Sequence, residues 1–322
     1  MTTAVWLQGG ACGGNTAAVL GAADPALADL AECGVEWLWH PALAPATGAA
    51  AEAVLAACAD GTTPLDLLVF EGAVIQGPDG TGRFDQLAGR PVRDWLADLA
   101  GQARFVVAVG TCAAFGGLAA LDPGPAAPTG LQFQRDAKGG CLGAGWRSSE
   151  GFPVINLAGC PVHPDIVLGV LLALATGRAG DLALDQFGRP RTYFTSFAHT
   201  GCPRQSYNEF KQAASAFGEG TRGGCLFAEL GCRGPMTHAA CNRLLWNGQS
   251  SKTRAGTPCL GCTEPDFPAA GLAPGTVFRT RTLSGAIPRE VPAGEDHVTY
   301  LARSAAARVA APEWAKADMF VV

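Results

Sequence analysis

Charged side chains are scarce in this chain, and it has neither a basic cluster nor a long apolar run. Asp, Glu, Lys and Arg make up 16% of the 322 residues, and the net charge is −5 at pH 7. A protein that binds nucleic acid needs a basic patch facing the phosphates, so nucleic acid is not an expected partner. No apolar stretch reaches the roughly 18 residues that a membrane-spanning helix needs.

Features of an export signal are also missing from the sequence. The opening MTTAVWLQGG has no basic segment followed by an apolar one, no twin-arginine pair precedes the first expected strand, and no hydrophobic anchor is visible at the C-terminus. We therefore expect a cytoplasmic protein, with a peripheral position at the membrane as the alternative. Twelve cysteines in that compartment favour metal ligation over disulfides.

The first half of the chain alternates short apolar runs with Ala- and Leu-rich stretches. This alternation predicts a parallel sheet with helices on both faces, in a five-stranded, flavodoxin-like arrangement. The expected strands are residues 4–7, 35–39, 65–70, 105–109 and 154–157, and the expected helices are 16–23, 49–59, 92–99 and 165–175. Two Gly- and Pro-rich or irregular stretches, 122–130 and 137–149, predict loops.

The second half of the chain is irregular, and Gly, Pro and Cys dominate it. We expect an α/β domain over 1–178 and an irregular, cysteine-rich domain over 179–322, in which metal–thiolate bonds replace part of the core. Helical pieces are expected at 205–217 and 299–311.

Three cysteines follow three of the expected strands, and Glu71 ends a fourth. The carboxyl ends of parallel strands share one edge, so Cys12, Cys112 and Cys160 should converge there, each beside small residues that let backbone N–H groups approach an inorganic cluster. Each could instead be a small core residue. The glycines around Cys12 could cradle phosphate, but the P-loop and dinucleotide patterns are missing. Cys33 and Cys58 are expected in the core, and Cys141 has no assigned role.

A second group of thiols lies between residues 199 and 262. Six cysteines and one histidine are too many for one structural zinc ion, and thiolates are the ligands of iron–sulfur clusters. We expect two clusters here, and the candidate ligands are His199, Cys202, Cys225, Cys232, Cys241, Cys259 and Cys262.

These motifs together resemble the small subunit of [NiFe] hydrogenases over nearly the whole chain. The resemblance rests on Cys12-Gly-Gly-Asn15, Glu71-Gly, Gly-Thr-Cys112, Cys160-Pro-x-His-Pro, His199-x-x-Cys202, Cys232-x-Gly-Pro and Pro-Cys259-x-Gly-Cys262-x-Glu-Pro. It implies three iron–sulfur clusters, held by a proximal group (Cys12, Asn15, Cys112, Cys160), a medial group (Cys241, Cys259, Cys262) and a distal group (His199, Cys202, Cys225, Cys232). The medial cluster would be [3Fe–4S] and the distal one [4Fe–4S].

The chain departs from the family pattern at several positions. Asn15 stands where the family has a second cysteine, so the proximal cluster is either [3Fe–4S] or a [4Fe–4S] cluster whose fourth ligand is Asn15 or a carboxylate such as Asp79. Lys252 replaces the proline near the medial cluster. The Cys225–Cys232 spacing is one residue longer than usual. Gly14 and Gly117 stand where the oxygen-tolerant membrane-bound type has extra cysteines.

The resemblance implies an electron-transferring subunit of a cytosolic uptake hydrogenase, like the cyanobacterial and high-affinity enzymes. H2 would be split at a Ni–Fe site in a large subunit, and electrons would leave to a quinone or a redox protein; an oligomer of heterodimers is expected. The alternatives are a hydrogen-sensing pair, against which Asn15 argues, and a relay like that of respiratory complex I, which lacks the cysteine-rich half. Glu71 would either relay protons or cap backbone N–H groups.

Overall fold

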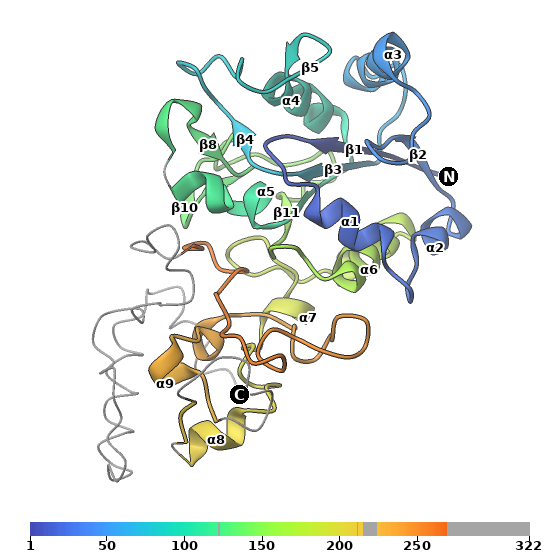
Figure 1. The fold of residues 1–322 in the computed structure, drawn as a ribbon. Helices are drawn as coiled ribbons and strands as arrows, with labels where there is room; N and C mark the ends of the chain where they lie inside the picture. Colours follow the sequence, from blue (N-terminus) through green and yellow to red (C-terminus); the bar gives the residue numbers. More distant parts are fainter. Residues whose placement is uncertain (122, 211, 215–223, 269–322) are drawn as a thin grey trace. The chain divides into compact units, whose positions relative to one another are not determined.

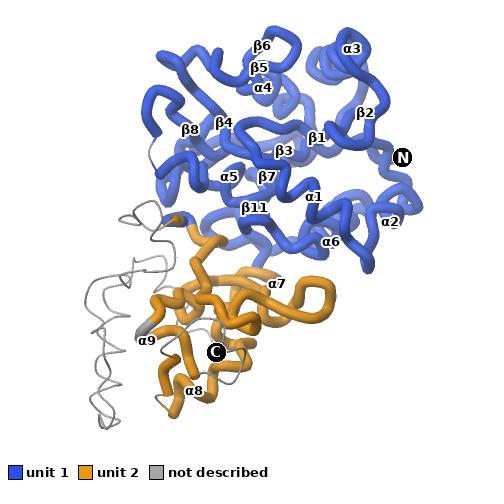
Figure 2. The backbone as a smooth tube through the Cα atoms, in the orientation of Figure 1, with its two compact units in different colours: residues 1–192, 265–267 blue, residues 193–264, 268–322 orange. Residues whose placement is uncertain are grey.

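The computed structural model describes residues 1–121, 123–210, 212–214 and 224–268. The chain divides into two compact units, which are coloured separately in Figure 2: unit 1 is Met1–Thr192 with Pro265–Phe267, and unit 2 is the remainder from Tyr193. Residues 299–311 and part of 205–217, both expected to be helical, lie outside the described residues. Among the described helices none has the length and apolar character to cross a membrane.

A five-stranded parallel sheet forms the centre of unit 1. Its strands are β1 (Thr2–Gln8), β2 (Val35–Trp39), β3 (Leu67–Glu71), β7 (Phe105–Val109) and β11 (Ile155–Leu157), in the order β11-β7-β3-β1-β2. This is the flavodoxin-like order, so the predicted fold class is confirmed. Every residue of β3 and β7 is buried, as expected for central strands covered on both faces.

Helices cover the two faces of this sheet. Figure 1 shows α3 (Gly48–Ala59) and α4 (Val92–Gln102) on one face, and α1 (Gly14–Leu20), α2 (Leu27–Glu32) and α6 (Pro164–Ala175) on the other. The apolar residues of α4 recur at helical spacing, and Val92, Trp95, Leu96 and Leu99 are all buried. Cys58 of α3 lies in the core as predicted. The core prediction for Cys33 is wrong, because this residue ends α2 with its side chain exposed.

Short elements fill the connections at the carboxyl ends of the strands. The 122–130 and 137–149 stretches, expected to be loops, include short strands that pair with neighbours, β8 with β4 and β10 with β9. The short elements of unit 1 are β4 (Val74–Ile75), β5 (Gln86–Leu87), β6 (Arg90–Pro91), α5 (Thr111–Phe115), η1 (Gly117–Leu121), η2 (Gly124–Ala126), β8 (Pro128–Thr129), β9 (Phe133–Gln134), β10 (Ala137–Lys138), η3 (Ala179–Asp181) and the first half of α7 (Arg191–Phe194).

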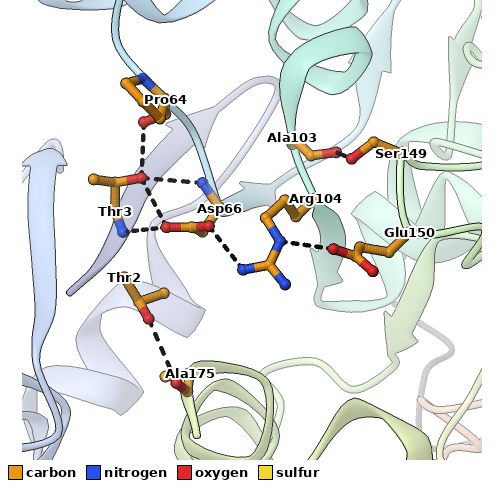
Figure 3. A network of polar contacts seen from close by, with 9 residues as sticks. All are labelled: Thr2, Thr3, Pro64, Asp66, Ala103, Arg104, Ser149, Glu150 and Ala175. Carbon is orange, nitrogen blue, oxygen red and sulfur yellow. Dashed lines mark hydrogen bonds and ion pairs between the residues drawn. The ribbon is translucent and has the colours of Figure 1, made fainter. Parts of the chain in front are cut away.

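A polar network ties the amino-terminal ends of three strands together (Figure 3). The Asp66 carboxylate accepts a hydrogen bond from the Thr3 backbone N–H at 2.8 Å and pairs with Arg104 Nη1 at 3.1 Å. Arg104 Nε pairs with Glu150 at 2.8 Å. Asp66 precedes β3, Arg104 precedes β7 and Thr3 lies in β1, so this network fixes the strand starts, at the sheet edge opposite the three cysteines.

Unit 2 has little regular structure among its described residues. Its helices are α8 (Gln205–Glu209), α9 (Phe227–Leu230) and the 3-10 turn η4 (Gly234–Met236). Its apolar cluster includes buried Cys225, Cys232 and Cys259 beside residues such as Leu226, Phe227 and Met236. Cysteines are thus a substantial part of the interior of this unit.

Candidate metal centres

The three cysteines of the proximal group lie at the carboxyl edge of the sheet. Cys12 follows β1, Cys112 lies in the first turn of α5 after β7, and Cys160 follows β11. A Cβ atom on Gly14 would lie 3.2 Å from Cys12 Sγ and 3.8 Å from the Cβ of Pro161, so the Cys12 loop packs on the residue after Cys160. Burial raises the pKa of Cys112, and the nearby charges of Cys12 and Glu71 raise it further.

The sulfur of Cys112 has space only because its neighbour is glycine. A Cβ atom on Gly117 would come within 2.6 Å of Cys112 Sγ, and Gly117 has φ +55°. The absence of a side chain at Gly117 therefore has a local steric reason.

Glu71 lies beneath this edge and accepts hydrogen bonds from several donors. Its side chain is 1% exposed. The carboxylate accepts from the backbone N–H groups of Asn15 and Thr16, at 2.9 and 3.2 Å, and from Thr16 Oγ1 at 2.5 Å. The side chains of Trp6 and Gln8 donate to it as well. These contacts occupy the lone pairs of both oxygens and cap the first turn of α1, which favours the capping role over the proton relay.

Asn15 joins the three cysteine loops through its carboxamide. Its Oδ1 accepts the Val162 N–H at 2.9 Å, and its Nδ2 donates to the Val109 carbonyl at 3.4 Å and to Glu71 at 3.3 Å. Val162 follows Cys160, and Val109 precedes Cys112. The side chain is 8% exposed. Asn15 therefore holds the loops of Cys112 and Cys160 against its own loop.

A second link joins the Cys112 and Cys160 loops directly. The Thr111 N–H donates to the Gly159 carbonyl at 2.9 Å, and the Gly159 N–H donates to Thr111 Oγ1 at 2.9 Å. Each partner immediately precedes a predicted ligand. His163, three residues after Cys160, accepts the Asp165 N–H through Nδ1 and caps α6.

The four residues of the distal group line one cavity in unit 2. His199, Cys202, Cys225 and Cys232 are among the residues that line it, together with Arg204 and Thr253. Cys202 Sγ lies 3.4 Å from Thr253 Oγ1 and accepts the Arg204 backbone N–H at 3.4 Å. Predicted ligands up to 33 positions apart in sequence thus converge, and one backbone N–H, that of Arg204, is directed at the Cys202 sulfur.

The medial group lies against the distal group. The Cys259 backbone N–H donates to Cys232 Sγ at 3.2 Å. Cys241, Cys259 and Cys262 are close enough for their charges to interact, and burial followed by these charges raises the pKa of Cys241 to about 12. Burial also raises the pKa of Cys225 and of Cys259, each to about 11. Thiols in this environment are neutral at pH 7, so metal binding must displace their protons.

This thiol-rich arrangement offers the donors that polynuclear clusters use. Among the residues that the structure describes, no three His, Cys, Asp or Glu side chains converge closely enough to hold one metal ion. A cluster imposes a different spacing, because each iron takes its own thiolate. The cavity lined by three cysteines and one histidine has the soft donors that iron–sulfur centres use.

Comparisons with known proteins identify the family. Residues 12–174 match the family model of the NADH ubiquinone oxidoreductase 20 Kd subunit, and residues 194–272 match the model of the C-terminal part of the NiFe/NiFeSe hydrogenase small subunit. The F420 non-reducing hydrogenase I small subunit of Methanosarcina mazei is 34% identical over 84% of this chain and 74% of its own length. This chain belongs to the [NiFe] hydrogenase small subunits.

Further relatives agree with this assignment. The periplasmic [NiFe] hydrogenase small subunit 1 of Nitratidesulfovibrio vulgaris is 34% identical over 82% of this chain and 78% of its own length. A solved actinobacterial-type NiFe-hydrogenase from Ralstonia eutropha H16 superimposes with a TM-score of 0.78 at 28% identity, covering 97% of this chain and 92% of that one. Other relatives are named uptake hydrogenase small subunits.

Family membership settles the general role of this small subunit. [NiFe] hydrogenase small subunits carry iron–sulfur clusters, pair with a large subunit, and are the electron-transfer partner of that catalytic subunit. The expected cytoplasmic location is contradicted, because several relatives are named periplasmic [NiFe] or [NiFeSe] hydrogenase small subunits.

Several residues around the ligands, among them Thr253, Thr237 and Arg204, were not singled out from the sequence. Thr253 and Thr237 lie 3.4 and 3.6 Å from the sulfurs of Cys202 and Cys259, and Arg204 lines the distal cavity. The buried side chains of His238 and Glu264 pair at 3.1 Å. Lys252, at the position of the family's proline, has an exposed side chain. For Arg204, its position two residues after the predicted ligand Cys202 is the one feature of the sequence that could have indicated a place beside the distal group.

Proposed function

We propose that this small subunit relays electrons from H2 oxidation at the large subunit's Ni–Fe site, through three iron–sulfur clusters, to an external acceptor. Such clusters, when bound, take up and release single electrons. The proximal group would hold the first cluster, the medial group a [3Fe–4S] cluster and the distal group a [4Fe–4S] cluster. Two relatives are named uptake hydrogenase small subunits, which supports H2 oxidation as the direction of the reaction.

One contact carries this proposal: the hydrogen bond from the Cys259 N–H to Cys232 Sγ, at 3.2 Å. It joins a predicted medial ligand to a predicted distal ligand without any intervening residue. The same region packs tightly, since a Cβ atom on Gly234 would lie 3.4 Å from Cys232 Sγ and 3.8 Å from Cys259 Cβ. Two adjacent centres that share a short bonded route suit electron transfer better than two separate structural sites do.

The proximal centre has two candidate compositions. Asn15 uses its carboxamide oxygen for the Val162 N–H, and an amide is a weak iron ligand beside thiolates. We therefore propose three thiolate ligands, Cys12, Cys112 and Cys160. They would hold either a [3Fe–4S] cluster or a [4Fe–4S] cluster completed by a carboxylate such as Asp79.

The setting of the enzyme is also a proposal. Relatives named periplasmic support an exported location for this subunit with its partner, which cell fractionation with an antibody against the chain would test. A quinone or a redox protein would accept the electrons, and heterodimers would assemble into a larger oligomer.

The test of the relay uses the anaerobically purified heterodimer. We expect about ten to eleven iron atoms per small subunit, and H2 should reduce three distinct centres seen by electron paramagnetic resonance. In Cys225→Ser, which removes a distal thiolate, H2 should still reduce the proximal centre while dye reduction falls at least tenfold. A protein that contains no iron, or whose centres H2 does not reduce, would contradict the relay.

A further inference from the structure

One buried cation in unit 2 has no carboxylate partner among the residues that the structure describes. The Arg204 side chain is 1% exposed. Its Nε donates to the Thr253 carbonyl at 2.8 Å, and its Nη1 donates to the Gly224 carbonyl. Both acceptors are neutral, and within the described part of the chain no Asp or Glu forms an ion pair with Arg204. A guanidinium keeps its charge even when buried, so the structure must balance this charge in another way.

One nitrogen of this guanidinium has no hydrogen-bond partner. Nη2 is fully buried and unsatisfied among the described residues. An unsatisfied buried charged donor is costly, and such groups normally mark a missing acceptor. Arg204 lines the same cavity as His199, Cys202, Cys225 and Cys232. An occupant of that cavity that reached Nη2 would supply the missing acceptor.

An occupant of the cavity with anionic acceptor atoms would supply both the negative charge and the hydrogen-bond acceptor that Arg204 lacks. Under the proposed function, on which this inference rests, the cavity holds a cluster bound by three thiolates, whose sulfur atoms are anionic acceptors. The Arg204 backbone N–H already donates to Cys202 Sγ at 3.4 Å. Backbone and side chain of one residue would then both face the distal centre.

We propose that Arg204 is the counter-charge of the distal centre and raises its reduction potential. A fixed positive charge in a buried site stabilises the added electron with little solvent screening. The distal centre would thereby hold the electron that the medial centre passes on. Arg204 acts here as a tuning residue and not as a ligand.

The test compares Arg204→Gln with wild type in the loaded heterodimer, by a redox titration followed by electron paramagnetic resonance. Glutamine can still donate to the Thr253 carbonyl but has no charge. We expect the reduction equilibrium of the distal centre to shift at least tenfold toward the oxidised form, which is 59 mV for one electron. The medial signal is the internal reference and should shift less.

Two further variants separate charge from structure. Arg204→Lys retains the charge and should recover most of the wild-type potential. Arg243→Gln removes an exposed arginine whose side chain approaches Gly201, next to Cys202, and should leave the potential unchanged because water screens that charge.

An intact distal signal with a shift below twofold in Arg204→Gln would overturn the tuning role. If Arg204→Gln loses the distal cluster, Arg204→Lys decides: a loaded cluster near the wild-type potential supports the proposal, and loss of the cluster there also overturns it. A wild-type protein without any distal cluster would instead refute the proposed relay. The two failures are therefore distinguishable by iron content.

Discussion

At position 15, a side chain that forms several hydrogen bonds stands where the family has a cysteine ligand. The family pattern has cysteine at this position, whereas here the carboxamide contacts Val162, Val109 and Glu71. Val162 is 147 positions and Val109 is 94 positions away in sequence. No local pattern could have predicted these partners, although the departure from cysteine was visible in the sequence.

Replacing Asn15 by cysteine should lower the potential of the proximal centre. A fourth thiolate adds negative charge to the site, which disfavours the added electron. The measurement is a redox titration of the proximal signal in wild type, Asn15→Cys and Asn15→Ala. The alanine variant loses the same hydrogen bonds but gains no thiolate, so it separates the two effects. A wild-type potential no higher than that of Asn15→Cys would refute the prediction.

His40 should make this subunit sensitive to mild acid. Its ring is 1% exposed, packs 5.1 Å from Trp6, and accepts the Ala42 N–H. Burial lowers the pKa of His40 to about 4, although the charge of Glu71 opposes the shift. The unfolded chain binds this proton near pH 6.5 and the folded chain does not, so stability falls as the pH drops below that value.

Between pH 7 and pH 5 the titration of His40 should lower the free energy of unfolding by about 2 kcal/mol. Urea unfolding followed by tryptophan fluorescence at the two pH values would measure it. In His40→Gln, which cannot be protonated, the loss of stability over this range should be smaller by about that amount. Equal pH dependence in the two proteins would show that His40 does not titrate in this way.

At the level of elements, the regular parts of unit 1 were predictable and the short ones were not. All five strands and the four longer helices follow apolar runs or Ala-rich stretches that are visible in the sequence. Helix α2 has only six residues, and α5 five, too few to show a helical period. The two-residue strands β4 and β8 depend on each other's pairing, which no local pattern records.

The network at the strand starts should stabilise the sheet without affecting turnover. Burial alone would raise the pKa of Asp66, but hydrogen bonds from Thr3 and the charge of Arg104 outweigh it and leave that pKa below its ordinary value. Asp66→Asn should therefore cost about 1 kcal/mol at pH 7, a modest value because Arg104 is half exposed.

This stabilisation is present above the ordinary carboxyl pKa and is lost as the pH falls through the lowered one, so the wild-type advantage should be smaller at pH 3 than at pH 7. Urea unfolding of both proteins at pH 7 and pH 3 would measure it. Glu150→Gln is the matched control. Because Glu150 is more exposed than Asp66, this substitution should lower the free energy of unfolding by less. Reduced H2 oxidation in Asp66→Asn with intact clusters would contradict a purely structural role.

At the scale of the whole molecule, the two units depend on different sources of stability. Unit 1 has a sheet whose central strands are fully buried, so we expect its fold to be independent of metal. Unit 2 has only short helices among its described residues, and three of the nine buried members of its apolar cluster are cysteines. Its structure should therefore depend on the clusters, because binding energy replaces the missing apolar core.

Extraction of the clusters should accordingly unfold one unit and spare the other. After anaerobic chelation, hydrogen exchange should show residues 193–264 losing protection while β3 and β7 keep theirs. Reassembly should release about one proton per cysteine ligand, since burial raises the pKa of Cys241 to about 12 and of Cys225 to about 11 and leaves those thiols protonated at pH 7. A pH-stat titration would count these protons. Full protection of residues 193–264 in the iron-free protein would show that unit 2 folds on its apolar contacts alone.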